Sequence, residues 1–269
     1  MDISVPQLTI IVGYYGVGKT NLALNLARRT ARKNAQPVTL VDLDIVNPYF
    51  RSSDYQQQLQ ASGIKLLAPT FARSTQDTPS LPAAISGAFS TPGTVIVDVG
   101  GDDAGATALA RYRADIERRT RQGTVLCPEE AGEGVHTPAD PATPDFAFWY
   151  VVNRFRSNAP DTQTAAAEAV AQLRDIEAAC HLKATGIINN THLQSETTLA
   201  TIQEGLAFGK TVAEMGALPL IATTIPEPLL SEARKTPPLK ALYNTGKLWP
   251  VDLLVTTPWQ TAPAWNVSP

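Results

Sequence analysis

Residues 8–29 read LTIIVGYYGVGKTNLALNLARR, and this stretch decides the fold. Its first five residues are apolar or β-branched, which is typical of a buried strand, whereas the residues after Lys19 have the spacing of a helix. Between them, residues 13–20 match GxxxxGK(S/T), a loop whose glycines let successive backbone N–H groups point at phosphate oxygens. The stretch predicts a nucleotide-binding strand, loop and helix; the alternative is a glycine-rich turn without a ligand.

The phosphate loop suggests roles for individual residues. Lys19 is expected to neutralise the β and γ phosphates, and the hydroxyl of Thr20 to ligate Mg²⁺. The N-terminus of the following helix adds a partial positive charge that also favours phosphate. Contacts to the nucleotide are expected from Gly13, Gly16, Val17, Gly18, Lys19, Thr20 and Asn21.

Apolar runs and helix-like stretches alternate along most of the chain. The runs are mostly continuous rather than alternating in polarity, which is typical of a parallel sheet covered on both faces. The sequence therefore predicts a doubly wound α/β fold with a mostly parallel sheet of seven or eight strands. The expected strands are 8–13, 37–44, 64–69, 94–101, 146–153, 184–190 and 218–226, and the expected helices are 19–33, 52–62, 79–89, 104–120, 161–181 and 196–216.

Two regions interrupt this alternation. Residues 121–145 are rich in proline, glycine and acidic residues and are expected to form an inserted surface loop. Residues 236–269 are rich in proline; within them, LWPVDLLV (248–255) is a candidate edge strand, and the rest is expected to pack as an extended arm. The predicted organisation is a nucleotide-binding domain over residues 1–235, with that inserted loop, followed by a C-terminal arm.

Carboxylates end two of the expected strands, at the sheet edge where the phosphate loop also lies. TVIVDVGG, residues 94–101, contains Asp98, a candidate Mg²⁺ ligand and catalytic residue. VDLD, residues 41–44, places Asp42 and Asp44 on one side of a strand. One of the pair could orient the attacking water and the other could bind Mg²⁺ through water, or one of them could cap the turn.

Composition excludes several classes of protein. The 269 residues carry a formal net charge of −3, which argues against a broad nucleic-acid-binding surface. The two cysteines, Cys127 and Cys180, form no CxxC pair, which excludes an intrachain thiolate metal site and favours a reducing compartment. Neither a signal peptide nor a membrane-spanning stretch is recognisable, so a cytoplasmic protein that does not bind membranes is expected.

Residues 7–230 resemble the SIMIBI class of P-loop ATPases, specifically the MinD/ParA/CobQ/CobB-type nucleotide-binding family. The phosphate loop, VDLD and TVIVDVGG carry the resemblance. It implies that Asp44 positions the hydrolytic water, and that Asp98 belongs to the Mg²⁺ shell, where Asp42 and Thr20 are the other candidates. The chain departs from the family pattern at Tyr14, where MinD and ParA proteins carry a signature lysine.

The same resemblance extends to the nucleoside. GIINNTH, residues 186–192, is similar to the family segment whose asparagine reads adenine, which implies Asn190 with Asn189 as its neighbour. IPEP, residues 225–228, is similar to the loop that packs on the base, which implies Pro226. A GTP-type NKxD run is absent, so ATP is the expected nucleotide.

Three functions fit these observations. The leading hypothesis is a Mg²⁺-dependent ATPase that acts as a switch on a protein client, with a nucleotide-dependent homodimer as a further expectation. The second is an ATP-dependent small-molecule ligase or kinase, similar to dethiobiotin synthetase or the cobyrinic acid amidases. The third is a DNA-partitioning ATPase; its best basic patch, on the helix expected at 104–120, interleaves with acidic residues and suits a solvated helix face better.

Overall fold

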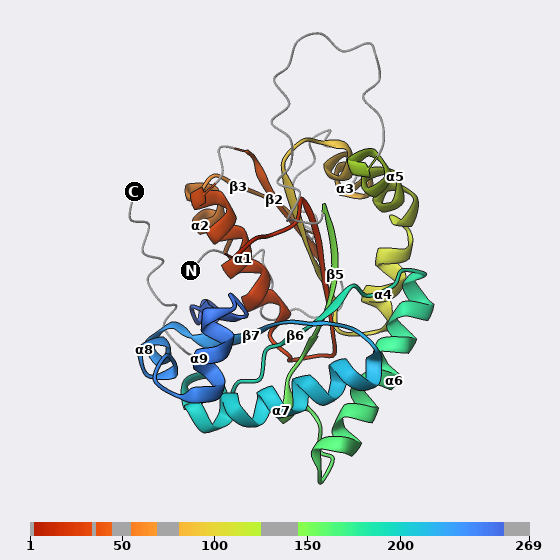
Figure 1. The fold of residues 1–269 in the computed structure, drawn as a ribbon. Coiled ribbons are helices and arrows are strands. Elements are labelled where there is room, and N and C mark those ends of the chain that lie inside the picture. Colours follow the sequence, from red (N-terminus) through yellow and green to blue (C-terminus); the bar gives the residue numbers. More distant parts are fainter. Residues whose placement is uncertain (1–2, 34–35, 45–54, 69–80, 125–144, 256–269) are drawn as a thin grey trace.

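A single sheet of eight parallel strands organises the molecule (Figure 1), a computed structural model that describes residues 3–33, 36–44, 55–68, 81–124 and 145–255. The strand order is β3-β2-β4-β1-β5-β6-β7-β8. The predicted α/β fold is confirmed, with the larger of the two expected strand numbers. The strands are β1 (Leu8–Val12), β2 (Val38–Leu43), β3 (Ile64–Leu67), β4 (Thr94–Val99), β5 (Phe146–Val152), β6 (Gly186–Asn189), β7 (Leu220–Pro226) and β8 (Leu248–Val251).

Helices cover both faces of the sheet, as the continuous apolar strands predict. Ile11 of β1 packs in the cluster that contains α1 and α2, whereas Ile10 and Val12 pack in the cluster that contains α3 to α7. The helices are α1 (Lys19–Lys33), α2 (Gln56–Ala61), α3 (Leu81–Ser90), α4 (Asp103–Ala110), α5 (Arg113–Thr124), α6 (Thr162–Cys180), α7 (Leu199–Gly216), α8 (Leu230–Ala233) and α9 (Pro237–Asn244).

The order of the strands places the phosphate loop at the centre of one sheet edge. β1 lies between β4 and β5, and the sheet extends from it toward β3 on one side and β8 on the other. In an open parallel sheet, ligands bind beyond the carboxyl ends of the strands where the winding reverses direction. Residues 13–18, which join β1 to α1, lie at that position.

Two expected elements differ from the structure. The helix expected over 104–120 is two helices, α4 and α5, and Tyr112 between them packs its ring 5.9 Å from that of Phe89. The tail begins with α9 rather than an extended arm, because Pro237 and Pro238 occupy the first helical turn, where a missing N–H is tolerated. The candidate edge strand is confirmed as β8, which pairs with β7. Most of the expected inserted loop, 125–144, lies outside the described residues.

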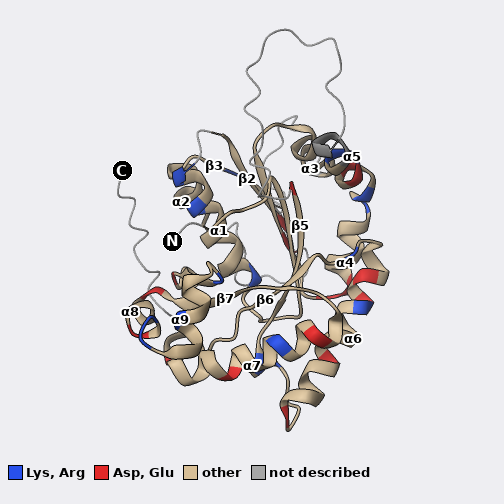
Figure 2. Ribbon diagram, in the orientation of Figure 1, with Lys and Arg blue, Asp and Glu red and all other residues tan. Residues whose placement is uncertain are grey.

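Two basic residues of α5 pair within the helix, and a third, Arg119, contacts other parts of the chain. Arg113 pairs with Glu117 at 2.7 Å and Arg118 pairs with Asp115 at 3.0 Å, so charges of both signs lie along this helix (Figure 2). The guanidinium of Arg119 donates to five backbone carbonyl groups between 2.6 and 3.4 Å away, four of them in residues 88–93 and one in residue 7. Arg119 thus joins the end of α3 to the start of β4.

Replacing Arg119 by Ala should lower the free energy of unfolding by about 2 kcal/mol, because several carbonyl groups lose a charged donor. The matched control is Arg118→Ala, which removes only an exposed ion pair and should cost less than about 0.5 kcal/mol. Urea denaturation of the two variants measures the difference. Equal stability would show that water replaces the Arg119 contacts at no cost.

Candidate functional site

A cavity of about 230 Å³ opens at the carboxyl ends of the strands. The phosphate loop forms one end of it, together with Asp44 from the segment after β2. The loops that follow β5 and β6 contribute further walls, and so do the end of β7 and the segment that follows β8. Three of the segments that the sequence singled out, 41–44, 186–192 and 225–228, therefore contribute to one cavity with the phosphate loop.

Three glycines of the phosphate loop, Gly13, Gly16 and Gly18, have backbone conformations that side chains rarely adopt. Gly16 has φ +73° and Gly18 has φ +87°. A Cβ at Gly16 would lie 2.9 Å from the guanidinium of Arg156, and one at Gly18 would overlap Asn190 and His192. Both positions therefore require glycine for backbone conformation and for close approach.

Lys19 is the buried cation of the site, with 8% of its surface exposed. Its Nζ donates to the carbonyl of Tyr14 at 3.1 Å, so the side chain folds back along the loop. Burial lowers the pKa of Lys19, while the charges of Asp98 and Asp44 oppose that shift. The ammonium group is thus held at the loop by a carbonyl and by nearby carboxylates.

Asp98 and Asp42 lie side by side in the sheet, as paired residues of β4 and β2. Both are buried, and Asp98 Oδ1 has no hydrogen-bond partner in the described part of the chain. Burial, and then the charge of Asp42, raises the pKa of Asp98 to about 7, while Lys19 and a hydrogen bond from Thr20 oppose the shift. A buried carboxylate oxygen without a partner is costly unless a cation or water completes its contacts.

This donor set fits Mg²⁺ bound together with a nucleotide. The Thr20 hydroxyl lines the cavity and hydrogen-bonds to Asp98, which leaves a carboxylate oxygen beside a hydroxyl. Hard oxygen ligands and few protein contacts suit Mg²⁺, which keeps several waters and phosphate oxygens in its shell. Within the described residues no group of three or more His, Cys, Asp or Glu side chains could hold a metal by itself, so the phosphates would have to supply ligands.

Asp44 lines the cavity beside the phosphate loop, and Asp252, after β8, is a second acidic residue in the lining. Its backbone N–H donates to Asp42 Oδ1 at 2.9 Å, which fixes the turn after β2. Asp42 therefore has the turn-capping contact that the sequence allowed for one of the pair. Asp44 is left at the cavity wall, while Asp42 is buried behind it, with 1% of its surface exposed.

The two asparagines after β6 have different surroundings. Asn189 is fully buried: its Oδ1 accepts from Thr191 and its Nδ2 donates to the Thr223 hydroxyl. Asn190 lines the cavity, where its Nδ2 donates to the carbonyl of Val17 at 2.7 Å and its Oδ1 accepts from the Thr224 hydroxyl. Asn190 thus supports the phosphate loop from the side, and Asn189 lies away from the cavity.

Two loop-supporting residues were missed at the sequence level. Arg156 Nε donates to the carbonyl of Gly16 at 2.8 Å. The His192 ring lies beside Val17 and Gly18, and its Nδ1 accepts from the N–H of Gln194. Burial, and then the charge of Arg156, lowers the pKa of His192 to about 4, so the ring is neutral at pH 7. No local pattern around either residue indicated contact with a loop about 140 to 175 positions earlier.

Of the remaining residues that were expected to contact the nucleotide, two line the cavity and two lie under or behind the phosphate loop. Pro226, at the end of β7, and Asn21 line the cavity. The Asn21 side chain also holds the backbone of residues 252–255. Val17 is buried beneath the loop, and Gly13 lies against the backbone of Val151.

No known protein-family model matches the sequence, and no curated protein is significantly similar to it. Solved structures resemble it at low identity. The signal recognition particle receptor FtsY from Elizabethkingia anophelis, in complex with GDP, is 17% identical over 84% of this chain and 59% of its own, with a TM-score of 0.45. FtsY from Mycoplasma mycoides is 14% identical over 84% of this chain and 61% of its own, with a TM-score of 0.47.

The hydrogenase maturation factor HypB from Archaeoglobus fulgidus is 12% identical over 81% of this chain and 80% of its own, with a TM-score of 0.40. The chain thus spans 59% and 61% of the two receptors it matches. Likenesses at this level say nothing about nucleotide, client or partner. No helix in the described ranges has the length and apolarity needed to cross a membrane. The sheet and the phosphate loop of the chain itself make it an α/β protein with a P-loop NTPase-like fold.

Proposed function

We propose that this protein is a Mg²⁺-dependent ATPase of the SIMIBI class, similar to MinD/ParA/CobQ/CobB-type proteins, that acts as a nucleotide-dependent switch on a protein client. The observation that carries the proposal is the unpartnered Oδ1 of buried Asp98, beside Thr20 and Lys19 at the phosphate loop. A carboxylate in that position is costly in the protein alone and is stabilised by a cation. A structural turn without a ligand would not need this group.

Different residues have different roles in the proposed hydrolysis. Loop N–H groups and Lys19 bind the phosphates and absorb negative charge as it develops. Asp44, at the cavity wall, orients the attacking water. Thr20 and Asp98, with Asp42 behind them, hold Mg²⁺, which when bound supplies positive charge to the phosphate oxygens.

The base is proposed to be adenine. Asn190 is one of the amide side chains that line the cavity, and residues 189–192 read Asn, Asn, Thr, His, with no aspartate to bind a guanine amino group. The Asn190 side chain already contacts Val17 and Thr224, so a base contact would use its remaining amide hydrogen or follow a rotation. Competition of ATP and GTP for the site, measured by calorimetry, tests the preference.

A protein client is favoured over a small-molecule acceptor by the surface around the loop. Tyr14 and Tyr15 have 47% and 53% of their surfaces exposed, and exposed tyrosines are frequent at protein interfaces. Arg154, one of the cations that could serve an acceptor, donates instead to the carbonyl groups of Ser157 and Ala159. The other two, Arg51 and Arg73, lie outside the described residues.

Calorimetry and product analysis test the proposed function together. Mg-ATP should bind the purified protein and turn over slowly to ADP and phosphate without an added acceptor. Turnover that depends strictly on a metabolite would instead support the ligase or kinase alternative. Light scattering with Mg-ATP tests the proposed nucleotide-dependent homodimer. The absence of Mg-ATP binding would exclude the proposal.

Replacing Asp98 by Asn should raise the Mg²⁺ concentration needed for half-maximal ATP turnover by about 10-fold, because one charged contact to the cation is lost.

In the metal-free protein, the same substitution should not lower the stability of the fold at high pH. Because the pKa of Asp98 is raised to about 7, its contribution to stability is present below its unfolded pKa and is lost as the pH rises through 7. At pH 8 the metal-free variant should therefore be at least as stable as the wild type, which thermal denaturation measures. A less stable variant would show that the ionised carboxylate is already compensated.

A further inference from the structure

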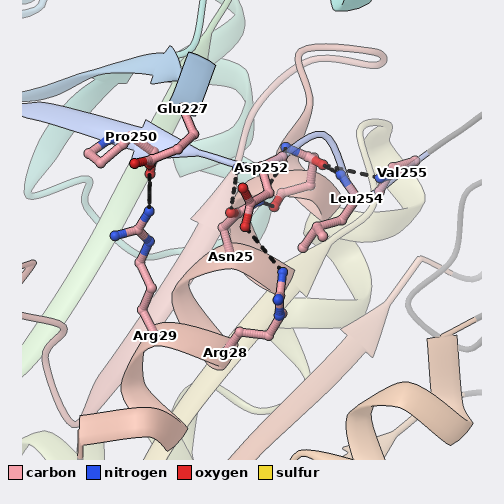
Figure 3. Close-up of polar contacts among 9 residues, drawn as sticks. Asn25, Arg28, Arg29, Glu227, Pro250, Asp252, Leu254 and Val255 are labelled. Carbon is pink, nitrogen blue, oxygen red and sulfur yellow. Dashed lines mark hydrogen bonds and ion pairs between the residues drawn. The ribbon is translucent and has the colours of Figure 1, made fainter. Parts of the chain in front are cut away.

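The segment after β8 lies directly against the first two turns of α1 (Figure 3). Asn21 and Asn25 are four positions apart and share one face of the helix. Asn25 Oδ1 accepts from the N–H of Asp252 at 2.8 Å, and its Nδ2 donates to the carbonyl of the same residue at 2.9 Å. Asn21 Oδ1 accepts from the N–H groups of Leu254 and Val255. Asparagine side chains thus pair with this backbone as a neighbouring strand would.

Further contacts from α1 hold the same segment and the end of β8 before it. The guanidinium of Arg28 lies 3.3 Å from the Asp252 carboxylate, and Arg29 donates to the carbonyl of Pro250 at 2.8 Å (Figure 3). Leu254 is buried in the cluster that contains α1. The four residues 252–255 are therefore held by backbone pairing, an ion pair and apolar packing, although they form no regular strand.

Leu253 has a different environment from Leu254. Along an extended chain, successive side chains alternate in direction. Leu254 is buried, whereas Leu253 has 42% of its surface exposed and lines the nucleotide cavity together with Val251, Asp252 and Val255. A leucine on a firmly anchored backbone, beside an open cavity, offers an apolar contact that the protein alone does not use.

The cavity is lined by the phosphate loop and by later parts of the chain. Gly18, Lys19 and Thr20 come from the loop and the start of α1, while Pro226 comes from β7 and Leu253 from the segment after β8. A triphosphate seated on the loop would leave its ribose and base to fill the remaining cavity. An apolar wall is suited to the face of a purine rather than to phosphate.

We propose that residues 251–255 form a nucleoside-binding wall, in which Leu253 contacts the purine and Asn21 and Asn25 act as positioning residues. This inference rests on the proposed function and adds a specificity element to it. Asn21, which holds the wall, directly follows Thr20 of the phosphate loop. The residue that contacts the phosphates and the residue that holds the wall therefore lie on the same turn of α1. Linkage then requires that nucleotide binding stabilises the docked segment, and that docking strengthens nucleotide binding by the same factor.

Calorimetric titration with Mg-ATP and with Mg-tripolyphosphate tests the wall. Leu253→Ala should weaken Mg-ATP binding by about 5-fold, because part of an apolar contact is lost, and should leave Mg-tripolyphosphate binding unchanged. The matched control is Leu193→Ala: Leu193 is also 42% exposed but is not among the residues that line the cavity. The control should change neither affinity.

Asn25→Ala tests the positioning role, because Asn25 anchors the segment without lining the cavity. It should weaken Mg-ATP more than Mg-tripolyphosphate and should speed amide exchange at Asp252. In the wild type, Mg-ATP should slow exchange at Asp252 and Leu254 more than Mg-tripolyphosphate does.

Three results would overturn the inference. In the first, Leu253→Ala weakens both ligands equally, which indicates general damage. In the second, the wild type binds Mg-ATP no more tightly than Mg-tripolyphosphate. The proposed phosphate binding by the loop then stands, and the proposed contact between the wall and the nucleoside is excluded. In the third, neither ligand binds the wild type, and the proposed function fails as well.

Discussion

Replacing Lys19 by Ala should weaken Mg-ATP binding by at least about 100-fold, the largest effect expected on affinity. The side chain is buried at the phosphate loop, where its ammonium group is held by the carbonyl of Tyr14 and by nearby carboxylates. Low solvent exposure strengthens its interaction with phosphate, and contacts made by a charged group are each worth about 1.5 to 3 kcal/mol. Calorimetric titration of the variant with Mg-ATP measures the loss.

Two further variants make the Lys19 result specific. Lys210→Ala removes an exposed lysine on α7 and should leave the affinity unchanged. Lys19→Arg keeps the charge but changes the size and geometry of the donor, so it should recover only part of the affinity. Circular dichroism of each variant checks that the fold is intact. If Lys19→Ala binds Mg-ATP as tightly as the wild type, the loop does not bind a nucleotide as proposed.

The elements that were predictable from the sequence are those with a local signal. The continuous apolar runs identified the strands because both faces of a parallel sheet are buried, and the glycines and Lys19 identified the phosphate loop. The boundary between α4 and α5 carries neither proline nor glycine: residues 109–113 read Leu, Ala, Arg, Tyr, Arg. The packing of Tyr112 on Phe89, from a distant helix, accompanies that break, and periodicity within one segment does not report such a contact.

Only some residues of the site were predictable from the sequence. Carboxylates at strand ends were predictable because parallel strands bring their carboxyl ends to one edge. Arg156 and His192 were not, because their partners are backbone carbonyl groups of the loop, and backbone acceptors leave no trace in sequence. Asn189 ends β6 and Asn190 directly follows it, still paired with Val152, so their side chains point to opposite sides as successive residues of an extended chain do.

The positions of the two aspartates after β2 suggest a division of roles. Asp42 accepts the N–H of Asp44 and is buried beside Asp98, so it sets the turn and adds negative charge to the Mg²⁺ side. Asp44 lies at the cavity wall itself, where its charge also acts on Lys19. Loss of its charge should therefore affect the attacking water more than ATP binding or folding.

Replacing Asp44 by Asn should lower the rate of ATP hydrolysis by about 100-fold while changing Mg-ATP affinity by less than about 3-fold, since general-base positioning contributes about 10² to 10⁴ in rate. The matched control is Asp102→Asn. Asp102 also lies near Lys19, but its Oδ1 caps α4 by accepting from Gly105 at 2.9 Å, and asparagine caps equally well. That variant should hydrolyse ATP at the wild-type rate. Phosphate release under saturating Mg-ATP measures both rates, and a normal rate in the Asp44 variant would move the catalytic role to another residue.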